Sequence, residues 1–327
     1  MRLAIDGMGG DHAPEAVVKG AAQALAEWPD LELILVGQAE RVQSLVARHP
    51  GLRFRPATQV IAMDEHPAQA VRTKTDSSIS VCARMCKQGE AEGWVSAGNS
   101  GAIMAAALFL QGRIRGVERP ALGSVVPTAS GTAYFLDVGA NVDSRPEFLV
   151  QFAHMGSVYA RELMHRERPR VGLLANGEED GKGDELTREV NARLRRNGSG
   201  LNFVGNVEPK EVFAGKADVV VADGFVGNVA IKMAEATADF FIQNLRQEIP
   251  TTVTGKIGGA LIRPGVRRIM NRIDWREFGG APLLGIDGVV VVAHGRSDER
   301  AIKSAIRVAR NAIGARLVDK IREAVAR

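Results

Sequence analysis

Short runs of β-branched residues alternate with glycine-rich turns and helix-like segments along most of the chain. One such unit reads "LAID", "GMGGDHAPE" and "AVVKGAAQALAEW" from residue 3 onward, and another reads "ADVVVAD", "GFVGN" and "VAIKMAEATADFF" from residue 217 onward. Strands and helices in this order are typical of parallel βαβ units. Strands as continuously apolar as "GVVVVAH" are typical of a sheet that helices cover on both faces. The sequence therefore predicts an α/β fold built on a doubly wound, mostly parallel sheet.

Nothing in the composition divides the chain into separate domains. No Pro/Gly/Ser-rich linker or charge block interrupts it, so we expect a single α/β domain over residues 1–327. One segment, at about 254–278, departs from the βαβ pattern. Its apolar residues recur with helical spacing on both sides of Pro264-Gly265. This spacing predicts two short amphipathic helices, joined by a turn, that protrude from the domain.

The charge of the chain is concentrated in that same segment. Residues 254–278 contain six basic and two acidic residues, which accounts for the net charge of +4 of the whole chain. A basic surface broad enough for nucleic acid is therefore excluded. The chain has two cysteines, Cys82 and Cys86, no secretory leader pattern and no apolar run long enough to span a bilayer. We expect a cytoplasmic protein whose cysteines pack as small apolar residues.

Polar turns that follow the predicted strands are candidates for a single site. Ligands bind where the carboxyl ends of parallel strands meet, and a glycine-rich turn before a helix leaves backbone N–H groups to face an anion. Helix capping explains any one of these turns, but five of them together favour a site for an anion of phosphate size. The candidate residues are Asp6, Gly9, Gly10, Asp11 and His12; Asn99, Ser100 and Gly101; Asp137 and Asn141; Glu178 and Lys182; and Asp223, Gly224, Gly227 and Asn228.

The turns match none of the common nucleotide, metal or hydrolase motifs. No turn reads G-x-G-x-x-G or GxxxxGK[ST], and no H-E-x-x-H, zinc-type Cys/His cluster or G-x-S-x-G occurs. Among the histidines, His12 and His294 follow predicted strands in glycine-containing turns. Each is a candidate proton donor or ligand contact, with a structural hydrogen bond as the alternative.

The ordered set of turns resembles the bacterial phosphate acyltransferase family of phospholipid synthesis, the acyl-acyl carrier protein:phosphate transacylases. The matching stretches include "MRLAIDGMGGDHAP", "SAGNSGA", "LDVGANVDSRPEFLVQFAHMGSVYA", "RVGLLANGEEDGKGDELT", "ADVVVADGFVGNVAIK" and "AHGRSD", in order over nearly the whole chain. The resemblance implies a three-layer αβα fold similar to isocitrate and isopropylmalate dehydrogenases and to phosphotransacetylase, a homodimer, and no metal or other cofactor. It also implies transfer of a fatty acyl group from acyl carrier protein to inorganic phosphate, giving acyl phosphate.

The residue types fit a direct attack of phosphate on a thioester. Phosphate is itself an oxygen nucleophile, so the protein needs groups that hold it and that stabilise the charge on the carbonyl oxygen. The hypothesis assigns positive charge to Lys182, an oxyanion donor to Asn228, thiolate protonation to His294, phosphate binding to Asn99 and Ser100, and orienting roles to Asp137 and Asn141. The alternative for Lys182 is a solvent-exposed lysine paired with its acidic neighbours Glu178, Glu179 and Asp180.

Two uses of the basic segment fit its pattern. An amphipathic helix flanked by arginines lies well at an anionic membrane surface, which would place the protein peripherally at the membrane. The alternative is a helix that packs in the core or against a second subunit. The residues assigned to membrane or partner contact are Lys256, Leu261, Ile262, Arg263, Arg267 and Arg268. Acidic acyl carrier protein would dock either on this segment or on Arg113, Arg115 and Arg119.

Two other functions stay open from the sequence. An NAD-dependent decarboxylating dehydrogenase of the same fold would carry metal-binding carboxylates and a dinucleotide loop, and the turns show no clear trace of that loop. A non-catalytic, membrane-associated scaffold for acyl carrier protein would have no need of five glycine-rich anion-binding turns.

Overall fold

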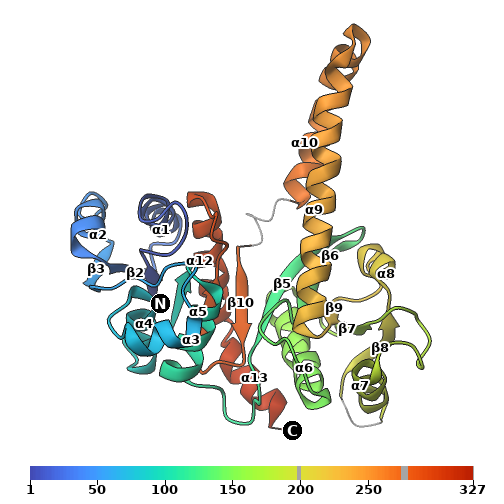
Figure 1. Ribbon diagram of the computed structural model, residues 1–327, viewed down its shortest axis with the longest axis horizontal. Helices are drawn as coiled ribbons and strands as arrows, with labels where there is room; N and C mark the ends of the chain where they lie inside the picture. The colour runs from blue at the N-terminus through green and yellow to red at the C-terminus, as the bar shows by residue number, and fades with distance from the viewer. Residues whose placement is uncertain (197–199, 274–278, 327) are drawn as a thin grey trace.

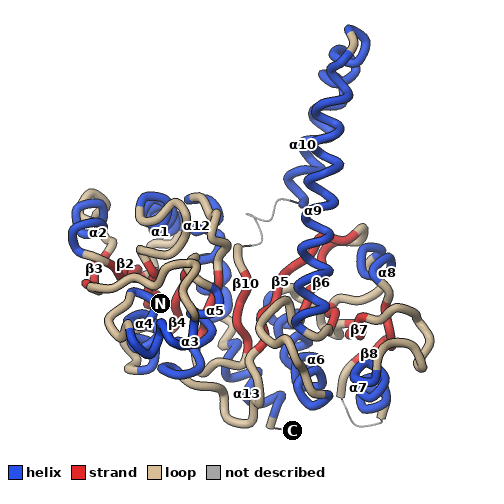
Figure 2. The backbone as a smooth tube through the Cα atoms, in the orientation of Figure 1, coloured by secondary structure: helices blue, strands red, loops and turns tan. Residues whose placement is uncertain are grey.

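A computed structural model describes residues 1–196, 200–273 and 279–326 and places one large sheet at their centre (Figures 1 and 2). The sheet has eleven strands within these ranges. In their order across the sheet, the strands are β3 (Arg53–Pro56), β2 (Glu32–Gly37), β1 (Arg2–Asp6), β4 (Gly93–Ser96), β11 (Val289–Val292), β10 (Ala281–Leu284), β5 (Ala121–Thr128), β6 (Gly131–Leu136), β9 (Val219–Val221), β7 (Arg170–Leu174) and β8 (Asn202–Val207). The prediction of an α/β fold on a mostly parallel sheet is confirmed.

The two halves of the sheet run in opposite directions. Strands β3, β2, β1, β4 and β11 are parallel to one another, and so are β6, β9, β7 and β8. Between these halves the pairs β11–β10, β10–β5 and β5–β6 are all antiparallel, and three reversals leave the halves opposed. The expectation that all the polar turns leave the sheet at one edge is therefore wrong. The turns of one half leave at one edge, and those of the other half leave at the opposite edge.

Helices cover both faces of the sheet and complete three layers. Side chains alternate between the faces along each strand, and the buried clusters on the two faces contain different helices. One face carries α1 (Glu15–Glu27), α2 (Ala39–Val46), α6 (Pro146–Leu163), α7 (Glu185–Arg195), α12 (Glu299–Gly314) and α13 (Leu317–Val325). The other face carries α3 (Pro67–Thr73), α4 (Ser78–Lys87), α5 (Ser100–Ala106) with the π-helical turn η1 (Ala107–Gln111), α8 (Pro209–Ala214) and the start of α9 (Gly224–Glu248).

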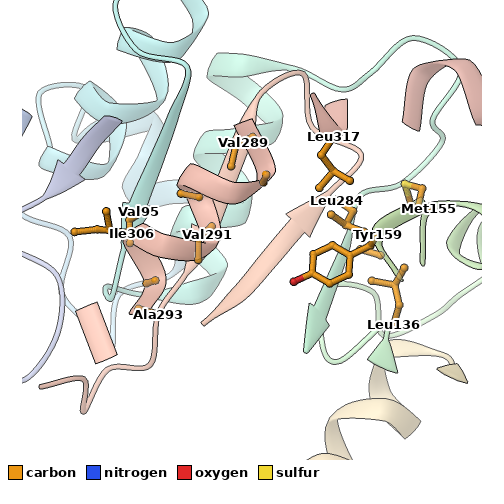
Figure 3. Close-up of a cluster of buried hydrophobic side chains, with 14 of the residues drawn as sticks. Val95, Leu136, Met155, Tyr159, Leu284, Val289, Val291, Ala293, Ile306 and Leu317 are labelled. Atoms are coloured by element: carbon orange, nitrogen blue, oxygen red, sulfur yellow. The ribbon is translucent and has the colours of Figure 1, made fainter. Parts of the chain in front are cut away.

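One buried cluster joins the two halves on the α6–α12 face (Figure 3). It takes Val95 and Val291 from the first half and Leu136 and Tyr159 from the second. The side chains of Leu136 and Val291 are fully buried. The core therefore runs through the whole sheet, although the single domain over 1–327 stays a prediction.

The long helix α9 leaves the body and forms a projecting pair with α10 (Val253–Ile273), joined by the 3₁₀ turn η2 (Ile249–Thr251) (Figures 1 and 2). The prediction of two short helices in this segment is wrong, because α10 continues through Pro264. A proline removes one helical hydrogen bond, and α10 keeps its helical form on both sides of it. Residues 274–278 of the predicted segment lie outside the described residues. Within the described ranges, none of the helices has the length and apolarity that crossing a membrane requires.

The position of Leu136 predicts how strongly the shared core stabilises the fold. Leu136→Ala removes a fully buried side chain between the halves and should lower the free energy of unfolding by about 2–5 kcal/mol. Val142→Ala, at an exposed site a few residues away, should change it by less than about 0.5 kcal/mol. Urea unfolding monitored by circular dichroism measures both changes, and equal effects would contradict a continuous core.

Candidate functional site

The turns after β1, β4 and β11 pack directly on one another. The backbone N–H of Asp11 donates to the carbonyl of Gly295 at 2.7 Å. A side chain at Gly9 would lie 2.5 Å from the backbone nitrogen of Gly98, so only glycine allows this approach. The predicted turns at Asp6–His12 and Asn99–Gly101 thus meet the turn that carries His294.

The carboxylate of Asp6 joins two of these turns by hydrogen bonds. It is buried and accepts hydrogen bonds from the Ser96 hydroxyl at 2.6 Å and the Met8 N–H at 3.0 Å. Burial raises the pKa of Asp6 above its usual value, and the hydrogen bonds oppose the rise. Asp6 therefore holds the turns in place, and the cavity described below does not include it.

Asn99 also holds the structure together. Its Oδ1 caps α5 by accepting the Ala102 N–H at 3.0 Å. Its Nδ2 donates to three carbonyls of the segment before α3, those of Ala62, Met63 and Glu65. With both ends of the amide engaged, the capping alternative describes Asn99 better than phosphate binding does.

Asp137 organises the turns of the second half. Its buried carboxylate accepts five N–H groups, from the backbone of Leu122, Gly139, Ala140 and Asn141 and from Asn141 Nδ2. Burial raises the pKa of Asp137, and these hydrogen bonds oppose the rise. The orienting role predicted for Asp137 and Asn141 matches this network.

The first turn of α9 docks on that network. A side chain at Gly224 would lie 2.6 Å from Asp137 Oδ2, and one at Gly227 would lie 1.9 Å from the Asp137 carbonyl oxygen. Asp223 caps the helix by accepting the Phe225 N–H at 2.9 Å. Asn228 Nδ2 donates to the Val138 carbonyl at 2.9 Å, so the amide is fixed at the start of α9.

A cavity of about 620 Å³ is lined by residues of β5, β10 and α9, by the turn after β11 and by Ser100 at the start of α5. Figure 1 shows β10 and β5 between α5 and α9. The cavity brings together three predicted residues from different turns, Ser100, Asn228 and His294. Since Ser100 and His294 belong to the first half and Asn228 to the second, the site forms where the halves face each other. Apolar side chains of β5 and α9 line much of the rest of the cavity, and residues of α8, α10, β10 and β11 complete it.

The cavity also contains polar residues that the sequence analysis missed, namely Lys232, Glu235, Ser297 and Ser124. Lys232 and Glu235 lie four and seven residues after Asn228, which is the spacing of one helix face. That spacing could have identified them from the sequence. Ser124 and Ser297 had no such signal, because nothing in the sequence showed which side of β5 or of the β11 turn would face the cavity.

His294 is held in a mixed electrostatic environment. Its Nδ1 accepts the Arg296 N–H at 3.2 Å. Partial burial lowers the pKa of His294 below its usual value of 6.5, Arg296 and Lys232 lower it further, and Glu235 and Asp11 oppose them. The neutral ring therefore dominates at pH 7, and the hydrogen bond at Nδ1 places its proton on Nε2.

Lys182 and Glu178 lie elsewhere, on the turn after β7. Glu178 pairs with Lys216 at 3.2 Å, and Asn206 Nδ2 donates to the Glu179 carbonyl at 2.8 Å. Lys182 is exposed and is not among the residues that line the cavity. The structure therefore does not bring Lys182 to Asn228, and its catalytic role stays a prediction.

His12 and several basic-segment residues line a second, larger cavity of about 1190 Å³ between the body and the projecting helices. Lys256, Ile262, Arg263 and Arg267 belong to it, and so does Glu235, which also lines the first cavity. His12 thus lies at the second cavity and is not among the residues that line the first.

Comparisons with known proteins agree on one family. Residues 1–320 match the model of the family described as "Fatty acid synthesis protein". A phosphate acyltransferase of Desulfitobacterium hafniense is 47% identical over 331 residues, which cover 100% of this chain and 98% of that protein. A phosphotransacetylase of Streptococcus pyogenes superposes with a TM-score of 0.66 at 19% identity, covering 96% of this chain and 94% of that one.

A 4-hydroxythreonine-4-phosphate dehydrogenase of Klebsiella pneumoniae superposes with a TM-score of 0.53 at 15% identity, over 94% of this chain and 96% of that one. At such identities the two solved structures show a shared fold and nothing of function. The predicted likeness to both dehydrogenase and phosphotransacetylase folds is thereby confirmed.

The charges around His294 predict opposite pKa shifts in two variants. Lys232→Met removes a positive neighbour and should raise the pKa of His294, whereas Glu235→Gln should lower it. Titration of the histidine resonances by NMR measures both shifts, with His294→Gln to assign the signal. Because the folded-state pKa lies below the unfolded value, this histidine destabilises the fold as the pH falls below about 6.5. Shifts of equal sign in the two variants would refute the arrangement.

Proposed function

This chain belongs to the fatty acid synthesis protein family, which matches 320 of its residues, and from that premise we propose that it transfers a fatty acyl group from acyl-acyl carrier protein to inorganic phosphate. It is an acyltransferase, as its phosphate acyltransferase relatives indicate. The observation that carries the finer proposal is the cavity between α5 and α9. It joins polar groups suited to phosphate and to a carbonyl oxygen with an apolar space suited to a fatty chain.

The proposed reaction needs no protein nucleophile. An oxygen of HPO₄²⁻ attacks the thioester carbonyl, a tetrahedral intermediate forms, and the carbon–sulfur bond breaks to give acyl phosphate and a thiolate. The proton that phosphate loses is the one that the thiolate takes up, so the step balances without an outside acid. The protein has to hold the two reactants together and stabilise the oxyanion.

Groups from both halves supply these functions in the proposal. Asn228 holds one amide hydrogen on Val138, and its second amide hydrogen serves the oxyanion. Ser100 and the positive charge of Lys232 hold phosphate within the same cavity. Neutral His294 donates a hydrogen bond from its Nε2–H to the departing sulfur and keeps that proton, because the proton from phosphate neutralises the thiolate. In this proposal a hydrogen-bond donor replaces the thiolate acid predicted for His294.

The projecting helices suit two further contacts that the family resemblance implies. Large apolar side chains of α9 and α10, among them Phe241 and Leu261, are more than half exposed. Exposed apolar strips of this kind mark interfaces, and we assign this one to a second copy in a homodimer. The basic residues Lys256, Arg263, Arg267 and Arg268 would add attraction to an anionic membrane.

Acyl carrier protein is the remaining proposed partner. The loop with Arg113, Arg115 and Arg119 is exposed and ends at Pro120, whose carbonyl accepts Asn141 Nδ2 at 2.9 Å. This contact ties the basic loop to the turns that hold Asn228. The loop is therefore the docking surface we favour for an acidic carrier.

Loss of the Asn228 amide should lower the rate of the chemical step, kcat, and not only the affinity for substrate. Asn228→Ala should lower kcat by about 100- to 1000-fold, the usual cost of one oxyanion donor. Asn244→Ala, on an exposed turn of the same helix, should keep the wild-type rate. The assay measures phosphate-dependent release of carrier protein from its acyl thioester, with thermal unfolding as the check on folding. A wild-type rate in Asn228→Ala would remove this residue from the site.

The two contacts of the projecting pair should separate by mutation. Leu261→Asp should shift the sedimentation mass from dimer to monomer, whereas Asn244→Asp, which adds the same charge without removing an apolar side chain, should not. Replacing Arg263, Arg267 and Arg268 by glutamate should weaken binding to phosphatidylglycerol vesicles by about a hundredfold or more at low salt. Vesicle binding that is insensitive to salt and to these charges would argue against membrane contact through this segment.

A further inference from the structure

The cavity extends far beyond its polar residues, along β5 and beneath α9. At one end, Leu122 accepts the Val138 N–H beside Asn228. At the other end, the Ala129 N–H donates to the carbonyl of Phe213 on α8. The residues at both ends line the same cavity, so one continuous space connects them.

The length of this space follows separately from the rise per residue of strand β5 and of helix α9. From Leu122 to Thr128 the strand advances six residues, or about 20 Å. From Asn228 to Ala238 the helix advances ten residues, or about 15 Å. Both lengths exceed what phosphate and a carbonyl group occupy, so most of the cavity is available to something else.

The wall that α9 presents to this space includes two small side chains among larger polar and apolar ones. Ala234 and Ala238 lie one turn apart on the half-buried side of the helix and line the cavity. Ala236 lies between them on the exposed side and is not a lining residue. Ile231 and Val126 add apolar surface on the helix and on the strand. A mainly apolar space that begins at an amide donor fits an unbranched chain with a carbonyl at its head.

We propose that this space holds the acyl chain of the donor along α9, and that Ala234 and Ala238 determine the longest chain the protein accepts. The proposal rests on the proposed function, since it places the reacting carbonyl at Asn228. Ala234 lies about 9 Å along the helix from Asn228 and Ala238 about 15 Å. A bulky side chain at Ala234 would close the space nearer to Asn228 than one at Ala238. Each position therefore sets a different limit on the length of the acyl chain.

The test places a phenylalanine at each of the two cavity positions and, as a matched control, at one position outside the cavity. Ala234→Phe, Ala238→Phe and Ala236→Phe add the same side chain to the same helix, the first two inside the cavity and the third outside. The donors are palmitoyl-, lauroyl- and octanoyl-pantetheine, and the readout is the ratio of kcat/KM for each longer donor to that for octanoyl. Because each ratio comes from one preparation, a general loss of folded protein cancels.

Ala234→Phe should lower the palmitoyl and the lauroyl ratio by about tenfold or more, since at least two methylenes lose their burial. Ala238→Phe should lower the palmitoyl ratio and spare the lauroyl ratio, and Ala236→Phe should match wild type. Wild-type ratios in both cavity variants, or equal losses in all three, would overturn the proposal.

The dissociation constants of the same thioesters, measured in the absence of phosphate, separate this proposal from the proposed function. If wild type binds palmitoyl-pantetheine with the predicted dependence on Ala234 and Ala238 but transfers nothing to phosphate, the chain-binding proposal holds and the proposed reaction is wrong. If transfer to phosphate proceeds while Ala234→Phe and Ala238→Phe leave the binding of long chains unchanged, the proposed reaction holds and the chain-binding proposal is wrong.

Discussion

The site depends on the reversal of strand direction in the middle of the sheet. A sheet with every strand parallel would send all its carboxyl-end turns to one edge, where helices cover both faces beside them. Here β10 and β5 run against their neighbours, and the helices of the two halves start from opposite edges. The result is a gap in one helical layer, between α5 and α9, in which Ser100 and His294 face Asn228.

One buried carboxylate in each half keeps this gap in shape. Asp6 and Asp137 occupy corresponding places at the ends of β1 and β6, and each accepts N–H groups from the turn that follows it. Burying an ionised group is costly, which is why both pKa values rise, and the charge-assisted hydrogen bonds offset that cost. These residues hold the turns in place, and neither is among the residues that line the cavity.

The sequence predicted what local patterns determine. Alternating strands and helices, the glycine turns and the projecting segment all follow from spacing and composition, and most of the polar turns do meet. Strand direction does not follow, because β5 and β10 read as ordinary strands, and the error about one common edge began there. Lys182 and Asn99 looked like ligands by residue type, whereas Lys182 is exposed on the turn after β7 and Asn99 is hydrogen-bonded to the segment before α3. Lys232 could have been found from the helical period.

Helix α9 couples the reaction, the chain path and the projecting pair. Its first turn is fixed on Asp137, its next turns carry Lys232 and Glu235 beside His294, and Ala234 and Ala238 line the apolar space. A rigid helix keeps these residues in constant register, at about 1.5 Å and 100° per residue. The helix then continues into the exposed pair without a break. Ala234 and Ala238 therefore keep a fixed spacing from Asn228, about 9 and 15 Å along the helix axis, and the chain path and the reacting group share one support.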